Sequence, residues 1–280
     1  MDQPEAEGEL MANLIRTLTI IFIVFTIICI LFCIEAYLRY RRKDGIDKDE
    51  KYHSHYQYFV QTIYGKDNQI TGYELLLREY SAGRWQLPND VRNFPLNLVA
   101  EAISDQRAQL EDPAKFVAIN MTVSRLLDFR AENFLNWVSG ALEGQQLVLE
   151  LDRSDVLSAT FFRRQALLRV LKMLVRDFPN VHVAIEEVDS SKYCYDKLSK
   201  FLPWIAYVKF DATAFNKSKD HWLEVTLGQW QRKLAKYQVQ EVLARVEDAD
   251  QDALAKQLNI DMRQGYLYQK PQQIEPKKQA

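Results

Sequence analysis

The sequence predicts an α/β fold, a modified (β/α)8 TIM-like barrel preceded by one N-terminal transmembrane helix. Two observations predict it: an apolar run stands near the N-terminus, and short β-rich runs then alternate with longer amphipathic segments. The chain has 280 residues, 48% of them hydrophobic, which suits one large domain. An open doubly wound sheet is the alternative architecture.

The apolar run covers Leu18 to Ile34, 17 residues in which only Thr19 and Thr26 are polar. At about 1.5 Å per residue, with apolar neighbours on both sides, it approaches the ~30 Å hydrocarbon thickness of a bilayer. We therefore expect a transmembrane helix over residues 14–38. A cleaved signal peptide is disfavoured, because the preceding residues 1–13 are acidic and no small-residue cleavage site follows.

Basic residues crowd the carboxyl flank of this helix. Arg39, Arg41, Arg42 and Lys43 follow it, against Arg16 on the other flank. Since Lys and Arg stay on the cytoplasmic side, we expect a single-pass protein of the cell membrane with an extracytoplasmic N-terminus and a cytoplasmic barrel. The predicted parts are a basic and polar linker over residues 39–52, the barrel domain over residues 53–271 and a disordered tail over residues 272–280.

Within the barrel, strands and helices are predicted from the period of the apolar residues. The predicted strands are Tyr58 to Tyr64, Gly72 to Leu77, Phe116 to Asn120, Leu147 to Leu151, His182 to Glu186, Ala206 to Phe210 and Gln240 to Ala244. The predicted helices are Leu96 to Leu110, Ala131 to Leu142, Ser158 to Phe178, Trp222 to Tyr237 and Asp250 to Leu258. The short polar turn between the first two strands favours an antiparallel hairpin.

Composition excludes some functions. The formal net charge of -2 lacks the basic excess of non-specific nucleic-acid binders, so no polynucleotide partner is expected. The three cysteines, Cys29, Cys33 and Cys194, have neither a disulfide pattern nor a zinc spacing.

Polar residues stand at or near the ends of several predicted strands. They are Glu74, Asn120, Glu150, Glu186, Glu187, Lys209 and Asp211. Each alone is explained by a solvent-facing or turn position, but together they would converge at the carboxyl end of a barrel, where active sites lie. Carboxylate and amide oxygens suit Mg²⁺ or Mn²⁺, and an ammonium suits phosphate. The set predicts a metal and phosphodiester site.

These segments resemble the EAL domain family. Tyr73-Glu74-Leu75-Leu76-Leu77-Arg78 resembles the signature in its ELL form, and Gln61-Thr62-Ile63 stands at its Gln-Pro-Ile. Ala118-Ile119-Asn120, Leu149-Glu150-Leu151, Val208-Lys209-Phe210-Asp211 and Gln264-Gly265-Tyr266 with Pro271 follow in the family's order. The resemblance implies an EAL-type barrel with an antiparallel first strand, and cyclic di-GMP as the ligand.

The resemblance also implies roles for residues. The implied metal ligands are Glu74, Asn120, Glu150, Glu186 and Glu187. The implied substrate contacts are Gln61, Arg78, Asp211 and Gln264, and the implied catalytic residues are Lys209 and Glu247.

Three departures indicate a degenerate member. The family's Asp-Asp-Phe-Gly-x-Gly loop reads Glu186-Glu187-Val188-Asp189-Ser190-Ser191, which fits the strict geometry of a second Mg²⁺ poorly. Asp152-Arg153 stands where the family has Thr-Glu, and Ala244-Arg245 where it has Glu-Gly; Glu247 takes the lost carboxylate's role only if the alignment shifts by three residues. Little turnover is therefore expected.

Three functions stay open. The domain is a cyclic di-GMP receptor, a ligand-free platform that docks a membrane partner such as an exopolysaccharide synthase, or a working phosphodiesterase that produces pGpG. The resemblance also permits a homodimer.

Overall fold

The computed structural model describes residues 3–41, 56–88, 96, 99–100, 103, 114–142, 144–215 and 222–273. The chain divides into two compact units, Met1–Ser54 and His55–Ala280. The first unit holds one helix and the second unit the sheet.

Helix α1 of the first unit spans Gln3–Arg41. Its segment Met11–Ala36 is long and apolar enough to cross a membrane, by length and composition alone, and its large apolar side chains are exposed. The span predicted over residues 14–38 lies within this helix. Residues 39–41 of the predicted linker are helical as well, and residues 42–52 lie outside the described part of the chain.

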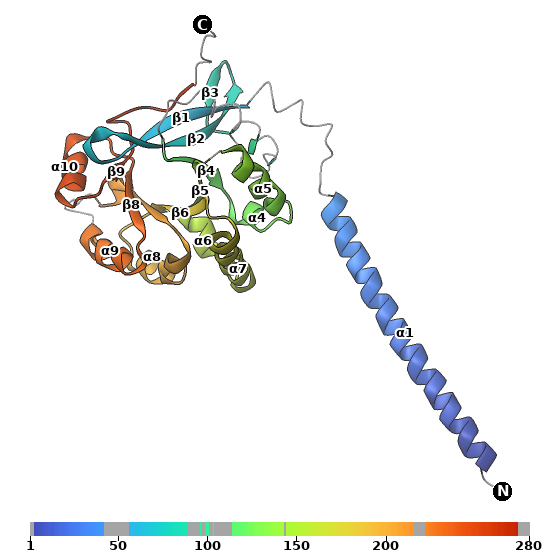
Figure 1. Ribbon diagram of the computed structural model, residues 1–280. Helices are drawn as coiled ribbons and strands as arrows, with labels where there is room; N and C mark the ends of the chain where they lie inside the picture. Colours follow the sequence, from blue (N-terminus) through green and yellow to red (C-terminus); the bar gives the residue numbers. More distant parts are fainter. Residues whose placement is uncertain are drawn as a thin grey trace. The chain divides into compact units, whose positions relative to one another are not determined.

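The second unit is a closed barrel of eight strands with two short strands added at its edges (Figure 1). Strand β1 pairs antiparallel with both β2 and β9 and so closes the ring, while β2 and β4 to β9 run parallel. The barrel strands are β1 (Tyr56–Tyr64), β2 (Ile70–Ser81), β4 (Phe116–Met121), β5 (Gln146–Asp152), β6 (Val181–Val188), β7 (Tyr207–Asp211), β8 (Gln240–Ala244) and β9 (Met262–Arg263). The predicted barrel is confirmed and the open sheet is wrong.

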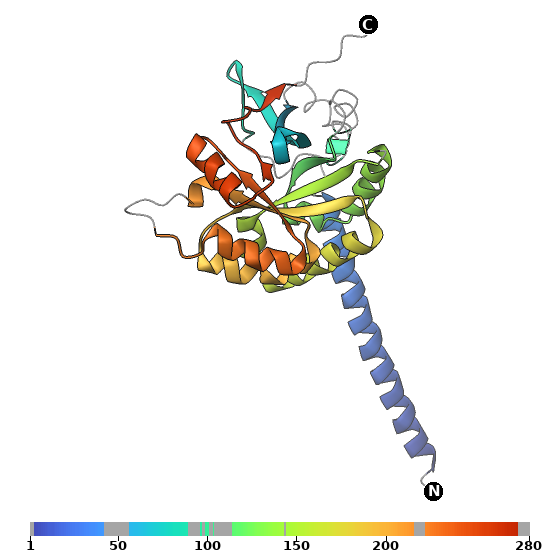
Figure 2. The ribbon, with the colours of Figure 1, turned by 60° about the vertical axis from the view of Figure 1, so that its left-hand side comes forward.

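Helices pack on the outside of the parallel strands (Figures 1 and 2). They are α4 (Val123–Leu126), α5 (Ala131–Ala141), α6 (Arg153–Ser158), α7 (Phe161–Asp177), α8 (Lys192–Lys197), α9 (Leu227–Leu234) and α10 (Ala249–Gln257). Side chains cap several of them: Thr160 accepts from the Arg163 amide, and Thr226 forms a capping box with Gln229. The helix predicted from Leu96 to Leu110 lies mostly outside the described residues.

A layer of apolar side chains fills the barrel interior below the strand ends. It includes Ile63, Phe116, Val148 and Tyr207. The ring centroids of Phe116 and Tyr207 lie 5.4 Å apart. Gly72 belongs here because a Cβ atom at this position would lie 2.5 Å from the Phe116 ring. The interior is thus closed, and any ligand must bind at the open carboxyl end.

Strand β9, which closes the barrel, and two short edge strands were not predicted. Strand β3 (Arg84–Gln86) pairs antiparallel with β2, and strand β10 (Gln272–Gln273) pairs with Phe59 and Val60 of β1. The tail predicted as disordered over residues 272–280 therefore begins as a strand, because β1 offers unpaired backbone groups at its outer edge. Residues 274–280 lie outside the described part.

Candidate functional site

A cavity of about 530 Å³ opens at the carboxyl ends of the parallel strands. This volume lies within the range of small-molecule sites. The predicted site residues that line it are Gln61, Glu74, Arg78, Asn120, Glu186, Glu187, Lys209, Asp211, Glu247 and Gln264. Glu150 lies behind them, with 1% of its side chain exposed. The structure therefore brings all the predicted site residues to one place.

Lys209 of β7 links two strands at the floor of the cavity, which is formed by the buried side chains of Lys209, Glu74 and Glu150. Its Nζ atom lies 2.9 Å from Oε2 of Glu74 on β2, and 2.8 and 2.9 Å from the two oxygens of Glu150 on β5. All three side chains are buried. Buried charges persist when they are paired, so each of these groups depends on the other two.

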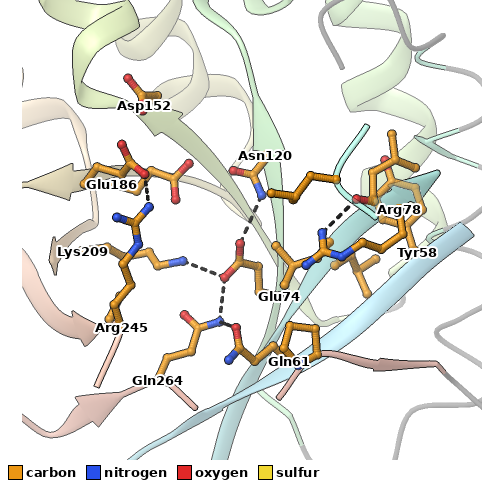
Figure 3. A pocket seen from close by; sticks show the side chains of 18 of the residues that line it. Tyr58, Gln61, Glu74, Arg78, Asn120, Asp152, Glu186, Lys209, Arg245 and Gln264 are labelled. Atoms are coloured by element: carbon orange, nitrogen blue, oxygen red, sulfur yellow. Dashed lines mark hydrogen bonds and ion pairs between the residues drawn. The ribbon is translucent and has the colours of Figure 1, made fainter. Parts of the chain in front are cut away.

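Glu74 is the centre of a hydrogen-bond network that Figure 3 shows. The amide of Asn120 donates to its Oε1 at 3.1 Å, and the amide of Gln264 donates to its Oε2 at 2.6 Å. Gln264 donates also to Gln61, whose own amide donates to the Gln269 carbonyl. Side chains from β4, β7 and the segment after β9 thus hold the Glu74 carboxylate directly, while Gln61 of β1 and Glu150 of β5 contact these partners.

Gly265 allows this segment to approach so closely. A Cβ atom on Gly265 would lie 2.1 Å from the carbonyl oxygen of Val246, and backbone atoms cannot move aside as a flexible side chain can. The Val246 amide also donates to the Gln264 carbonyl at 3.0 Å. The glycine in the Gln-Gly-Tyr element therefore positions Gln264 against Glu74.

Burial and charge shift the pKa values of these groups in different directions. Burial, together with the neighbouring Glu74, raises the pKa of Glu150 well above its ordinary value. Burial also opposes ionisation of Glu74, but the Lys209 ammonium and the hydrogen bonds outweigh it and lower the pKa of Glu74. Burial raises the pKa of Glu186 to about 7. The negative charge on the floor is therefore concentrated on Glu74, beside the Lys209 ammonium.

The floor carries the donor set of one hard divalent cation. Among the described residues, oxygens of Glu74, Glu150 and Glu186 lie within 4.8 Å of one another. The Asn120 side chain is exposed to the cavity beside them. Oxygen donors of this kind suit Mg²⁺ or Mn²⁺, and an incoming ion would compete with Lys209 for the same carboxylates.

The remaining carboxylates follow a different pattern. Arg245 forms ion pairs with Glu187 and with Asp211, the latter at 2.9 Å from Nη1 to Oδ2. Ala244, which pairs with Asp211 in the sheet, supplies no ligand. Asp152 instead accepts hydrogen bonds from the Ser154 and Asp155 amides and caps α6. These residues do not fit a second metal ion.

Two predicted residues lie at the rim. Glu247 is exposed, lines the cavity, and its backbone amide donates to the Gln251 side chain at 2.7 Å. Arg78 donates to the Leu77 carbonyl at 3.0 Å, and its guanidinium lies 6.0 Å from the Phe59 ring. Both side chains reach the open part of the cavity.

Sequence reasoning does not identify some lining residues. Tyr58 and Arg125 line the cavity, and neither stands at the carboxyl end of a parallel strand. Tyr58 reaches it because β1 is antiparallel and starts at the cavity end. By alternation Tyr58 lies on the face of β1 opposite to Gln61 and Ile63, which point into the barrel, so the strand pattern does not identify it, and nothing in the sequence marks Arg125.

Comparison with known proteins agrees with this geometry. The EAL domain model matches residues 53–271. One solved structure with the same fold is the Bacillus subtilis YkuI protein, with an EAL domain, in complex with substrate c-di-GMP and calcium; its TM-score is 0.62 and its identity 17%, over 84% of this chain and 59% of that chain. Another is the FimX EAL domain of Xanthomonas citri in complex with c-di-GMP, with a TM-score of 0.59 and 14% identity, over 81% of this chain and 91% of that chain. A third is the PaMucR phosphodiesterase in complex with c-di-GMP, with 0.61 and 18% over 78% and 97%.

The chain thus spans less than two thirds of the YkuI protein. No protein with a curated description matches it in sequence. The family model nevertheless covers the whole barrel and every residue of the candidate site. The chain therefore belongs to the EAL domain family.

Proposed function

We propose that this protein is a membrane-anchored cyclic di-GMP receptor that hydrolyses its ligand slowly or not at all. One observation carries the proposal: Glu74, Lys209, Asn120, Gln61 and Gln264 form one connected network on the floor of a cavity of about 530 Å³. The solved structures with this fold that were named above contain c-di-GMP.

The cavity offers groups for both parts of a dinucleotide. Arg78 and Tyr266 at the rim supply a guanidinium and an aromatic face, which suit a phosphate and a stacked base. The amides of Gln61 and Gln264 lie deeper and are held in place by each other. A divalent ion held by Glu74, Asn120, Glu150 and Glu186 would neutralise the charge of a bound phosphodiester.

The site lacks side-chain groups that hydrolysis needs. Ala244 offers no oxygen at the end of β8, and the Asp211 carboxylate accepts from Thr213 and Arg245. An alanine cannot accept a proton, and general acid or base assistance contributes roughly 10²- to 10⁴-fold to a rate. We therefore infer binding with little turnover.

We infer further that α1 spans the cell membrane and that the barrel domain lies in the cytoplasm. The support is the length and apolarity of Met11–Ala36 and the cluster of basic residues after it. A receptor so anchored would act on a partner at the membrane, such as an exopolysaccharide synthase, or within a homodimer.

A working phosphodiesterase is the second candidate, and the buried pairing of Lys209 with Glu74 and Glu150 favours it. In this case Lys209 lies beside the reacting phosphodiester and Glu247 accepts a proton at the rim. A divalent ion would supply the charge that stabilises the transition state.

Calorimetric titration of the full chain in detergent micelles with cyclic di-GMP separates these functions. Titrations in Ca²⁺, Mg²⁺ and Mn²⁺ are followed by chromatography for pGpG, with Arg78→Ala as the binding variant and the exposed Arg232→Ala on α9 as its matched control. Binding that only Arg78→Ala weakens, without product, supports the receptor. Product that is lost in Glu74→Gln would establish the phosphodiesterase, and an absence of binding in every metal would leave the ligand-free platform.

A further inference from the structure

Arg245 supplies a positive charge beside two carboxylates at the strand ends. Its guanidinium forms ion pairs with Glu187 at the end of β6 and with Asp211 at the end of β7. The side chain is 54% exposed and lines the same cavity as the floor network. Figure 3 shows Arg245 on the opposite side of the cavity from Asn120 and Arg78.

A guanidinium here has two consequences. It stays protonated at every physiological pH, so its single positive charge permanently offsets part of the charge of the two carboxylates and repels a divalent ion from them. It also has five N–H donors, and the contacts with Glu187 and Asp211 occupy one on Nη1 and one on Nη2. Donors remain that can point into the cavity, where phosphate oxygens are suitable acceptors.

The backbone supports a specific placement of this side chain. Arg245 has a φ of 56°, a left-handed conformation that is unfavourable for a non-glycine residue. Glu187, its partner, also has a positive φ, of 55°. The ion pairs formed by Arg245 offset this cost only while both residues keep these conformations, so the two strand ends hold the guanidinium in one position.

We propose that Arg245 serves in place of a second divalent ion: it closes the Glu187 and Asp211 carboxylates to metal and binds a phosphate of the nucleotide. The chain then holds a single high-affinity divalent ion, at Glu74, Glu150 and Glu186, and part of its nucleotide affinity is independent of metal. The phosphate contact rests on the proposed function, whereas the number of metal ions does not.

Manganese binding tests the number of ions. The full chain in micelles is titrated with Mn²⁺ and the bound ions are counted by electron paramagnetic resonance. We expect one high-affinity ion in the unchanged chain and a second ion in Arg245→Gly, which suits the positive φ and frees both carboxylates. Arg245→Asn, which also tolerates this conformation, guards against a folding defect in the first variant. Arg232→Gln is the control and should bind one ion.

Nucleotide binding in excess chelator tests the phosphate contact. The unchanged chain should bind cyclic di-GMP without metal, and Arg245→Gly should bind it at least about tenfold more weakly, the effect of one charge-assisted hydrogen bond. Two ions in the unchanged chain, or one ion in both Arg245 variants, would overturn the inference even if the nucleotide binds. If no variant binds nucleotide under any condition, the proposed function and the phosphate contact both fail, while the metal count still decides whether Arg245 excludes an ion.

Discussion

The Nζ atom of Lys209 lies 2.8 Å from Oε1 and 2.9 Å from Oε2 of Glu150, a side chain with 1% exposure. One ammonium thus contacts both oxygens of a carboxylate that water does not reach. The same ammonium contacts Glu74, so burial of either carboxylate depends on Lys209. Lys209 and its two partners therefore contribute to the stability of the barrel as well as to the candidate site.

Lys209→Met should therefore lower the free energy of unfolding by about 3–5 kcal/mol, because it leaves the buried Glu74 carboxylate without a cation. Millimolar Mg²⁺ or Mn²⁺ should restore part of this loss, since the ion replaces the missing charge. Denaturant unfolding of the full chain in micelles, followed by near-ultraviolet circular dichroism, measures both effects. The exposed Lys236→Met is the control. Equal stability of the two variants would show that the floor tolerates unpaired carboxylates.

Glu74→Gln should destabilise the chain more than Glu150→Gln, by roughly 1–2 kcal/mol. Glu74 accepts from Lys209, Asn120 and Gln264, whereas Glu150 accepts from Lys209 among the described contacts. An amide at position 74 turns an NH₂ group toward at least one of these donors. The same unfolding measurement compares the two isosteric variants, and the opposite order would mean that the Gln264 and Asn120 bonds contribute little.

Gly265→Ala should cost about 2 kcal/mol or more, because its Cβ atom would lie 2.1 Å from the Val246 carbonyl oxygen. Gly140 on α5 is the matched control, since no atom lies within 4 Å of a Cβ there. Gly140→Ala should be neutral or stabilising by about 0.5–1 kcal/mol. Thermal unfolding distinguishes the two. If both changes had equal effects, the close approach of the Gln-Gly-Tyr segment to Val246 would be disproved.

Glu241 on β8 should make stability depend on pH. Burial raises its pKa to about 7, and its Oε2 has no hydrogen-bond partner among the described residues. The unfolded chain loses this proton near the ordinary value of 4.5, so the free energy of unfolding falls as the pH rises from about 4.5 to about 7.

Glu241→Gln keeps the position neutral and removes this dependence. The variant should be about 1 kcal/mol more stable than the unchanged chain at pH 8, and equally stable near pH 4.5. Unfolding at both pH values, compared between the two proteins, isolates Glu241 because all other groups titrate in both. A difference that stays constant with pH would contradict the raised pKa of the buried Glu241 carboxyl group.

The sequence predicts the barrel and its strand-end residues because alternation and strand-end polarity are local patterns. Glu74, Asn120, Glu150 and Lys209 each stand in a short apolar run, and parallel pairing then places them together. The ion pairs of Arg245 depend on the backbone at three strand ends, two of which have a non-glycine residue with positive φ, and no periodicity reveals this. Strand β10 is equally hidden, because Gln272 and Gln273 have no strand propensity and pair only where β1 offers an edge.

Strand β1 runs against its neighbours, and this determines where the chain enters the barrel. In a barrel of regular βα units, the first strand starts at the end opposite the active site. Here Tyr56, at the start of β1, pairs with Glu79 near the carboxyl end of β2. The direction of a nine-residue strand thus moves the point of attachment by about 30 Å, to the rim of the cavity. A partner protein bound at the start of β1 would therefore lie at the cavity opening through which a nucleotide must enter.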